Sequence, residues 1–260
     1  MPEVDNSSTL PEWLFPWPEF DADWEKCALL IIDYQNYSSN PESGLSLVMK
    51  EKCPSLADYY LPRITNTTIP NTKKLLDRFR ASQMPIIFTR HGALLPDGSD
   101  MIERRRKRDK DALEGANAPT MWPKGDFEYE VISELEPKSG ELVIDKNSSS
   151  PFNSTGIDQL LKNLGVNSLI VTGMATDMCV ETTSRDAADR GFNMIIVEDA
   201  VATFVEEHHF AALSGFSRVF GKVWNTEDVL HALDGWCNRK QRVSSDSSAP
   251  TQAMHDEPRA

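Results

Sequence analysis

The sequence alternates short apolar runs with amphipathic segments, and this alternation limits the possible fold more than any other feature. The amphipathic segments have helical spacing of apolar residues and lie at 71–83, at 156–165 and between Cys179 and Gly191. Strands that are apolar along their whole length are buried on both faces, which requires parallel pairing with helices on both sides. We therefore expect a doubly wound three-layer α/β/α fold with a six-stranded parallel sheet. The predicted strands are 27–33, 85–90, 141–145, 168–173, 193–199 and 218–223.

The predicted domain boundaries lie where apolar surface ends. A chain of 260 residues has the size of one large α/β domain. We expect an extended amino-terminal segment at 1–22, one folded domain at 23–237, and a disordered tail at 238–260, which is polar and has no periodicity. Two long irregular segments, 33–72 and 91–127, follow predicted strands. Because ligands bind at the carboxyl ends of strands in open α/β sheets, these segments are candidate walls of a pocket.

The composition argues against two classes of partner. The net charge of −13 is unfavourable for general binding to nucleic acid, which depends on Lys and Arg side chains that neutralise phosphates. One basic run, 103–111, contains interleaved acidic residues, and we interpret it as a solvated loop or helix face rather than a nuclear-localisation signal. No apolar run approaches the ~20 residues that a membrane span requires. We therefore expect neither a nucleic-acid partner nor a membrane partner.

The amino terminus and the cysteines indicate a reducing compartment. Residues 1–20 are acidic and interrupted by prolines, whereas a secretory signal has a basic start and then a continuous apolar run. The four cysteines, Cys27, Cys53, Cys179 and Cys237, form no CxxC pair and no regular framework. Such spacing favours neither a zinc site nor a disulfide scaffold. We therefore expect a cytoplasmic protein with reduced thiols.

Three polar residues lie at or just beyond the ends of predicted strands. Asp33 ends the first run, Lys146 follows the third, and Cys179 comes six residues after Gly173. A thiol in the first turn of a helix is close to the positive end of the helix dipole, and a nearby Lys would lower its pKa further. A carboxylate within reach can accept the thiol proton and pass it to a leaving group. Taken singly, Asp33 would be a loop cap, Lys146 a surface charge and Cys179 an inert buried thiol. The order and positions of the three residues favour a catalytic site.

Three motifs surround the three polar residues: GMATDMCVETTSRDAADRGF (173–192), DYQ (33–35) and DKNSSSPFNST (145–155). They resemble the motifs of the isochorismatase-like cysteine hydrolases. The first is similar to the family signature around the nucleophile, the second to the family's D-x-Q, and the third to the segment with the family lysine. The resemblance extends over 27–233. The stretch LFPWPEFDADWEKCALLIID (14–33) also resembles the branch that acts on biuret, ureidoacrylate and N-carbamoyl compounds. The family sheet has the order 3-2-1-4-5-6, which we expect here.

The resemblance implies a triad with a defined role for each residue. Asp33 is the expected general acid/base, Lys146 the electrostatic partner and Cys179 the nucleophile. The family also has a cis peptide at the position of Met174 and Ala175. The backbone NH groups of Ala175 and Cys179 are then the expected oxyanion hole, and such donors stabilise a transition state by about 3 to 4 kcal/mol each.

The same resemblance implies a substrate class. We expect hydrolysis of a C–N bond in a small amide or ureide through a thioester intermediate, with release of ammonia or an amine and with no metal or organic cofactor. Self-association into a dimer or tetramer is a further expectation. The candidate substrate contacts are Gln35, Arg90, Trp122, Phe152, Phe216 and one arginine of 104–108 that reaches inward.

Two other functions remain open at this point. An isochorismatase-type hydrolase of a vinyl ether can act without a thiol nucleophile, and a non-catalytic redox or binding protein can keep the same fold. Family members that hydrolyse nicotinamide carry a D-x-H metal motif near the second strand, where this chain has His91 as its only histidine, so we expect this metal site to be absent and a nicotinamidase function is disfavoured. His208 and His209 are adjacent on a predicted helix, so they point about 100 degrees apart and are interpreted as helix surface rather than as a metal pair.

Overall fold

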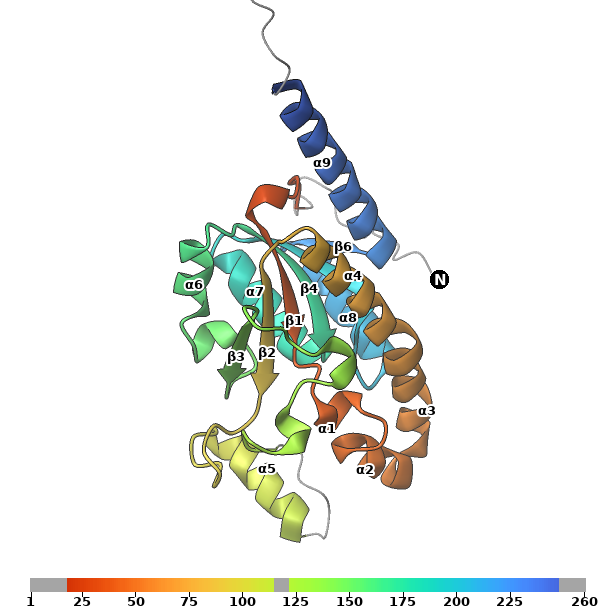
Figure 1. Cartoon of the computed structure of the whole chain (residues 1–260). Coiled ribbons are helices and arrows are strands. Elements are labelled where there is room, and N and C mark those ends of the chain that lie inside the picture. Colours follow the sequence, from red (N-terminus) through yellow and green to blue (C-terminus); the bar gives the residue numbers. More distant parts are fainter. Residues whose placement is uncertain (1–17, 115–121, 248–260) are drawn as a thin grey trace, which may run out of the picture.

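Six parallel strands form one sheet in the order β3-β2-β1-β4-β5-β6, which confirms the predicted fold class and strand order (Figure 1). The computed structural model describes residues 18–114 and 122–247. The chain winds in opposite directions from β1 and β4, which are neighbours at the centre of the sheet. The strands are β1 (Cys27–Ile32), β2 (Ile86–His91), β3 (Leu142–Lys146), β4 (Ser168–Met174), β5 (Asn193–Ala202) and β6 (Lys222–Trp224).

Alternate residues of the buried strand β1 face opposite sides of the sheet. Leu29 and Ile31 belong to one apolar core, and Leu30 and Ile32 belong to the other. Each core is closed by helices, because a parallel sheet buries both of its faces. The first core includes residues of α3 (Pro54–Arg63), the π-helical segment η2 (Ile64–Thr68), α4 (Ile69–Ala81) and α9 (Thr226–Ser247), and the second includes residues of α6 (Ile157–Asn163), α7 (Glu181–Asp189) and α8 (Glu206–Ser217).

The two long segments that follow β1 and β2 are more regular than the sequence indicates. The first contains several helices, and the second contains α5, which includes the basic run 103–111. Helices α1, α2 and α5 lie beyond the carboxyl ends of the strands, where the prediction places the walls of a pocket (Figure 1). These three helices are α1 (Asn36–Ser39), α2 (Gly44–Lys52) and α5 (Glu103–Glu114). The short helical turns are η1 (Trp24–Lys26), η3 (Phe127–Tyr129), η4 (Ser133–Leu135), η5 (Pro151–Asn153) and η6 (Thr176–Val180).

Predicted boundaries near the end of the chain differ from the structure. The last strand begins at Lys222 rather than at residue 218, because the amides of Val219 and Phe220 donate hydrogen bonds to Phe216 and so close the end of α8. The prediction of a disordered tail from residue 238 is wrong for 238–247, which continue α9. The remainder of that tail, 248–260, lies outside the described residues.

The predicted amino-terminal segment is also partly inside the folded domain. Phe20 and Ala22 pack against the first core, and Lys222 Nζ donates a 2.6 Å hydrogen bond to the carbonyl oxygen of Phe20. Residues 1–17 of that segment lie outside the described residues. No helix within 18–114 or 122–247 is long and apolar enough to cross a bilayer.

Gly173 allows β1 and β4 to approach each other closely at their carboxyl ends. Its φ is +137°, and a Cβ placed there would lie 2.2 Å from the carbonyl oxygen of Ile32. Residues with a side chain rarely adopt this backbone conformation. Both the backbone conformation and the close contact with Ile32 therefore require glycine at this position of β4, beside the residue that precedes Asp33.

We predict that Gly173→Ala destabilises the protein more than Gly140→Ala. Gly140 has a φ of +93°, but a Cβ at this position would have no atom within 4 Å, so the variant reports the backbone cost alone, about 1 to 3 kcal/mol. At Gly173 the backbone collision adds overpacking of about 1 to 3 kcal/mol. Urea unfolding of both variants measures the difference in free energy of unfolding, and equal values for the two would contradict this account.

Candidate active site

Asp33, Lys146 and Cys179 meet at the carboxyl edge of the sheet. Asp33 follows β1, Lys146 ends β3, and Cys179 lies in η6, directly after β4. The Lys146 Nζ atom is 2.7 Å from Asp33 Oδ2 and 3.4 Å from Cys179 Sγ. All three residues are buried, with exposed fractions of 1% for Asp33, 0% for Lys146 and 7% for Cys179. The structure therefore brings together the three residues that the sequence singled out.

Lys146 reaches the other two residues by leaning across β2, which lies between β3 and β1. Its ammonium group also donates hydrogen bonds to the carbonyl oxygens of Ser148, at 3.2 Å, and Ser149, at 3.0 Å. These backbone acceptors come from the turn that follows β3. A buried ammonium costs free energy unless its protons are paired, and here carbonyl oxygens and a carboxylate provide the partners.

Asp33 is held in position from both sides. Its backbone has a φ of +53°, in the left-handed region, so the chain turns sharply at the end of β1. The Thr89 hydroxyl donates a 2.6 Å hydrogen bond to Oδ1, and Lys146 donates to Oδ2. Each carboxylate oxygen therefore has a donor that fixes its direction relative to Cys179.

The thiol of Cys179 is protonated in this environment. Burial raises the pKa of Cys179, Lys146 lowers it and Asp33 raises it, with a net result of about 12. Lys146 lowers the pKa of the thiol as expected, but desolvation and the adjacent carboxylate outweigh this effect. Burial alone would lower the pKa of Lys146, but attraction to Asp33 and Cys179 raises it. The site thus holds a neutral thiol beside a charged lysine.

The turn that carries Cys179 also borders a small cavity. The peptide bond between Met174 and Ala175 is cis, as the family resemblance implied. The Ala175 carbonyl oxygen accepts hydrogen bonds from the amides of Met178, at 3.0 Å, and Val180, at 3.2 Å. Met174, Ala175 and Cys179 all line a cavity of about 80 Å³, together with Tyr37, Ser38, Leu45, Tyr60, His91, Arg105, Arg108, Met178 and Phe204.

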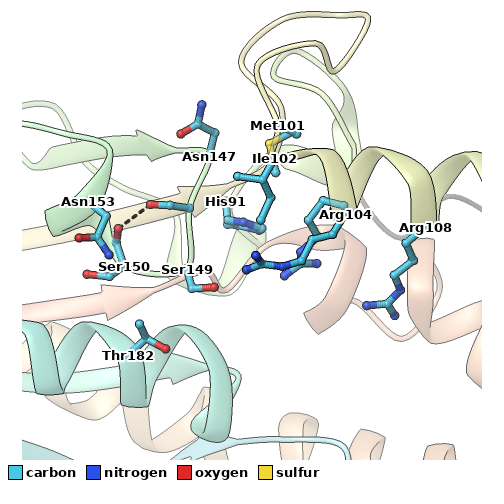
Figure 2. A pocket seen from close by; sticks show the side chains of 12 residues that line it. His91, Met101, Ile102, Arg104, Arg108, Asn147, Ser149, Ser150, Asn153 and Thr182 are labelled. Carbon is cyan, nitrogen blue, oxygen red and sulfur yellow. Dashed lines mark hydrogen bonds between the residues drawn. The ribbon is translucent and has the colours of Figure 1, made fainter.

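A larger cavity of about 570 Å³ adjoins the small one. Figure 2 shows arginines of α5 on one side of it and the Ser- and Asn-rich turn after β3 on the other. His91, Arg105 and Arg108 line both cavities, so the two spaces share a wall of three side chains. The other lining residues of the larger cavity are Met101, Ile102, Arg104, Asn147, Ser148, Ser149, Ser150, Asn153 and Thr182.

Gln35 supports the site rather than lining it. Its buried side chain donates to the carbonyl oxygens of His91, at 3.1 Å, and Tyr129, at 2.7 Å, and accepts a 2.7 Å hydrogen bond from the His91 amide. These bonds hold the end of β2, so the imidazole of His91 faces the cavities. Burial lowers the pKa of His91 strongly, with smaller contributions from Lys146 and Arg105, and the ring is neutral.

The prediction that an arginine of 104–108 reaches inward agrees with the cavity linings, whereas the four other predicted substrate contacts lie away from them. Arg90 pairs with Asp145, 2.8 Å away, and with Glu130. Phe216 is fully buried in the core, and Phe152 packs against Phe192 there. Trp122 stacks on Tyr37 at 5.5 Å between ring centroids, so it contacts a lining residue without lining the cavity itself. Residue type and position near a strand end therefore do not identify a substrate contact here, because Arg90 is in an ion pair and the two phenylalanines are in the core.

His209 is buried and belongs to a polar network, which corrects its interpretation as helix surface. Its Nε2 lies 3.1 Å from Glu198 Oε1, and its Nδ1 lies 2.9 Å from Thr176 Oγ1. Arg63 donates to the same carboxylate at 2.9 Å and to the carbonyl oxygens of Glu198 and Val201. Thr176 begins η6, so this network supports the turn that carries the thiol. The sequence signal that distinguishes His209 from its exposed neighbour is its helical register with buried apolar residues.

The network also has consistent electrostatics. Burial alone would raise the pKa of Glu198, but hydrogen bonds from His209 and Arg63 lower it. Burial lowers the pKa of His209, and the interaction with Glu198 only partly offsets this. The network therefore contains a charged carboxylate paired with Arg63. Within the described ranges, no group of three His, Cys, Asp or Glu side chains is arranged to hold a metal ion.

We predict that His209→Ala destabilises the protein by about 1 to 3 kcal/mol, because Glu198 and Thr176 lose a buried hydrogen-bond partner. His208→Ala is the matched control, since the His208 side chain is 63% exposed, and its cost should stay within about 0.5 kcal/mol. Denaturant unfolding of both variants gives the two values. A His209→Ala protein as stable as the control would show that the network contributes nothing.

We predict that alkylation of Cys179 accelerates steadily with pH. Because its pKa of about 12 lies above the accessible range, the thiolate fraction should rise about tenfold per pH unit from pH 7 to pH 10 without a plateau. Peptide-level mass spectrometry after timed iodoacetamide treatment measures this rate, and the exposed Cys53 in the same digest shows that the reagent remains active. A plateau below about pH 8 would mean that the resting group is a thiolate.

The chain matches known proteins over most of its length. Residues 27–228 match the family model "Isochorismatase domain". The chain is 29% identical to nicotinamidase 3 from Arabidopsis thaliana over 83% of this chain and 92% of the relative, and 28% identical to ureidoacrylate amidohydrolase RutB from Serratia proteamaculans over 80% and 83%.

Solved structures agree with this assignment. A cysteine hydrolase from Pseudomonas syringae pv. phaseolicola superposes with a TM-score of 0.69 at 26% identity, over 85% of this chain and 98% of that one. N-carbamoylsarcosine amidase from Thermoplasma acidophilum gives a TM-score of 0.55 at 26% identity, over 77% and 96%. The chain belongs to the isochorismatase-domain family of hydrolases, and its fold is that of the family's cysteine hydrolases.

Proposed function

We propose that the protein is a cysteine-dependent hydrolase that cleaves a C–N bond in a small amide or ureide through a thioester. The observation that carries this proposal is the buried contact of Lys146 with both Asp33 and Cys179 at a cavity of about 80 Å³. A carboxylate and a thiol in this relation can exchange a proton, and the fixed ammonium beside them stabilises the resulting thiolate. The names of the relatives as a nicotinamidase, an amidohydrolase and an amidase support the same bond class.

The first half of the proposed reaction forms the thioester. Asp33 accepts the proton of the Cys179 thiol as the sulfur attacks the carbonyl carbon of the substrate. The carbonyl π electrons move to the oxygen, and the amide groups of Ala175 and Cys179 donate hydrogen bonds to this oxyanion. The oxyanion then re-forms the carbonyl while the C–N bond breaks. The leaving nitrogen takes the proton from Asp33 and departs as ammonia or an amine.

The second half of the proposed reaction releases the acid. Asp33, again a carboxylate, accepts a proton from a water molecule as the water oxygen attacks the thioester carbon. The same two amide groups stabilise the second oxyanion. When the C–S bond breaks, the sulfur takes the proton from Asp33, and the neutral thiol is restored. Lys146 keeps its proton throughout and acts by charge, since both Asp33 and the transient thiolate lie within its reach.

The neutral resting thiol favours this proton route over a preformed thiolate. Burial and the carboxylate keep the thiol protonated, so a nucleophile forms only as Asp33 accepts the proton. Charge is then conserved at the site, because Asp33 becomes neutral as the sulfur becomes negative. Lys146 thus faces one negative charge before and after the transfer, which avoids an unpaired buried ion.

A reducing compartment suits this proposal. The four cysteines are all free thiols, and Cys179 must stay reduced to act as a nucleophile. We accordingly place the reaction in the cytoplasm.

We also propose that the active form is a dimer or tetramer. Light scattering after size exclusion measures this oligomeric state directly.

We predict that Cys179→Ala abolishes hydrolysis, and that the wild-type enzyme accumulates an acyl adduct with a slow substrate. Ammonia release is measured across a panel of ureides, aliphatic amides and aromatic amides, with Cys179→Ala as the blank. Intact-protein mass spectrometry detects the adduct, and peptide mapping assigns it to Cys179.

Two outcomes would contradict the proposal. Full turnover by Cys179→Ser without any adduct in the wild type would exclude the thioester route. Release of pyruvate from isochorismate by the Cys179→Ala protein, with no ammonia from any amide, would assign the site to vinyl ether hydrolysis instead.

A further inference from the structure

We propose that the substrate carries a carboxylate at the end remote from the cleaved bond, and that Arg105 and Arg108 of α5 bind this carboxylate. The inference rests on the proposed C–N hydrolase function and adds to it the chemical class of the substrate. It follows from how the two cavities join, from the charges that line them and from the register of α5.

The two cavities form one path from Cys179 to the outside of the site. The inner cavity of about 80 Å³ contains the thiol, and the outer cavity of about 570 Å³ does not. Arg105 and Arg108 line both, together with His91. A molecule whose carbonyl lies against Cys179 and whose remainder extends outward therefore passes these two guanidinium groups.

The inner and outer spaces differ in chemical character. Around the thiol the lining is mostly apolar and aromatic, with Tyr37, Leu45 and Phe204 among its residues. The outer lining provides hydroxyl and amide groups from Ser149, Asn153 and other residues of the turn after β3 (Figure 2). This arrangement suits a substrate with a compact reactive group inside and a strongly hydrated group outside.

The charge of the shared wall is positive although the whole chain is strongly negative. The net charge is −13, yet the residues that line the outer cavity include three arginines and no Asp or Glu. Within the described parts of the chain, no Asp or Glu forms an ion pair with Arg104, Arg105 or Arg108.

His91 does not supply a compensating charge either. Burial, Lys146 and Arg105 together lower the pKa of His91, so its ring stays neutral beside the arginines. The charges of Asp33 and Lys146 offset each other in their ion pair. An anionic group of the substrate would therefore be the partner of the guanidinium groups, and Arg binds carboxylates through two parallel hydrogen bonds.

The register of α5 separates the cavity arginines from the rest of the basic run. Residues three apart share a helix face, so Arg105 and Arg108 point in similar directions. Arg106 is exposed and lines neither cavity. Hydrogen bonds from Ser99 lower the pKa of Asp97, burial raises it, and the charge of Arg106 makes a smaller lowering contribution. The run 103–111 is thus more than a solvated helix face, and Arg106 offers a matched control on the same helix.

Matched substrate pairs test the proposal. N-carbamoylglycine is compared with 2-hydroxyethylurea, and succinamate with butyramide, so that each pair differs in the carboxylate. In the pair that the enzyme hydrolyses faster, we expect kcat/KM to be at least about tenfold higher for the compound with the carboxylate than for the compound without it. In Arg105→Gln and Arg108→Gln this ratio of kcat/KM values should fall toward one, because KM for the carboxylate compound rises. Arg105→Lys should retain part of the ratio. Arg106→Gln, the control, should keep the wild-type ratio.

A binding measurement separates failure of this inference from failure of the proposed function. Calorimetric titration of Cys179→Ala protein with N-carbamoylglycine or succinamate should give weaker binding, by at least about tenfold, when Arg105→Gln is added. If the enzyme releases no ammonia from any compound but this difference is present, the carboxylate site stands and the C–N hydrolase proposal fails. If wild-type enzyme hydrolyses both members of a pair equally well, or if Arg106→Gln lowers the ratio as much as Arg105→Gln, the carboxylate site is overturned.

Discussion

The buried ion pair between Lys146 and Asp33 is the interaction on which the site depends. Its two atoms are 2.7 Å apart, and neither residue exposes more than 1% of its surface. Removal of one partner from such a pair costs about 3 to 5 kcal/mol, because the other charge stays buried alone. Burial has the largest effect on the Cys179 thiol and raises its pKa, while the two members of the pair act in opposite directions, since Lys146 lowers this pKa and Asp33 raises it.

The scaffold places these charges by bringing three strand ends together. The chain reverses its direction of winding between β1 and β4, so Asp33 and the turn before Cys179 are neighbours, and Gly173 permits the close approach. The turn is also supported by His209, which contacts Thr176 through a hydrogen bond. Cys179 thus contacts the ion pair through Lys146, and the turn that carries it contacts the buried network through Thr176.

The fold and the three central site residues were predictable, whereas the residues around them were not. Apolar runs with helices between them require a parallel sheet, and the motifs at Asp33, Lys146 and Cys179 resemble a known family. The predicted contact Arg90 is bound to Asp145, and the interpretation of His209 as surface is wrong because α8 turns it inward while its neighbour is exposed. The helical register of His209 with buried apolar residues indicates its burial, whereas the ion pair of Arg90 joins two strands and is not specified by residue type and spacing.

The sequence by itself determined the layers, the strand order through its family resemblance, and the three residues at the strand ends, because hydrophobic periodicity and motif order are local properties. The tertiary structure alone decided that Lys146 crosses β2 to reach Asp33 and that the thiol is protonated. It also decided that two of the arginines in one basic run face both cavities while Arg106 does not. The physical reason is that desolvation, charge pairing and cavity shape arise from residues far apart in the chain, and only the packed fold sets their distances.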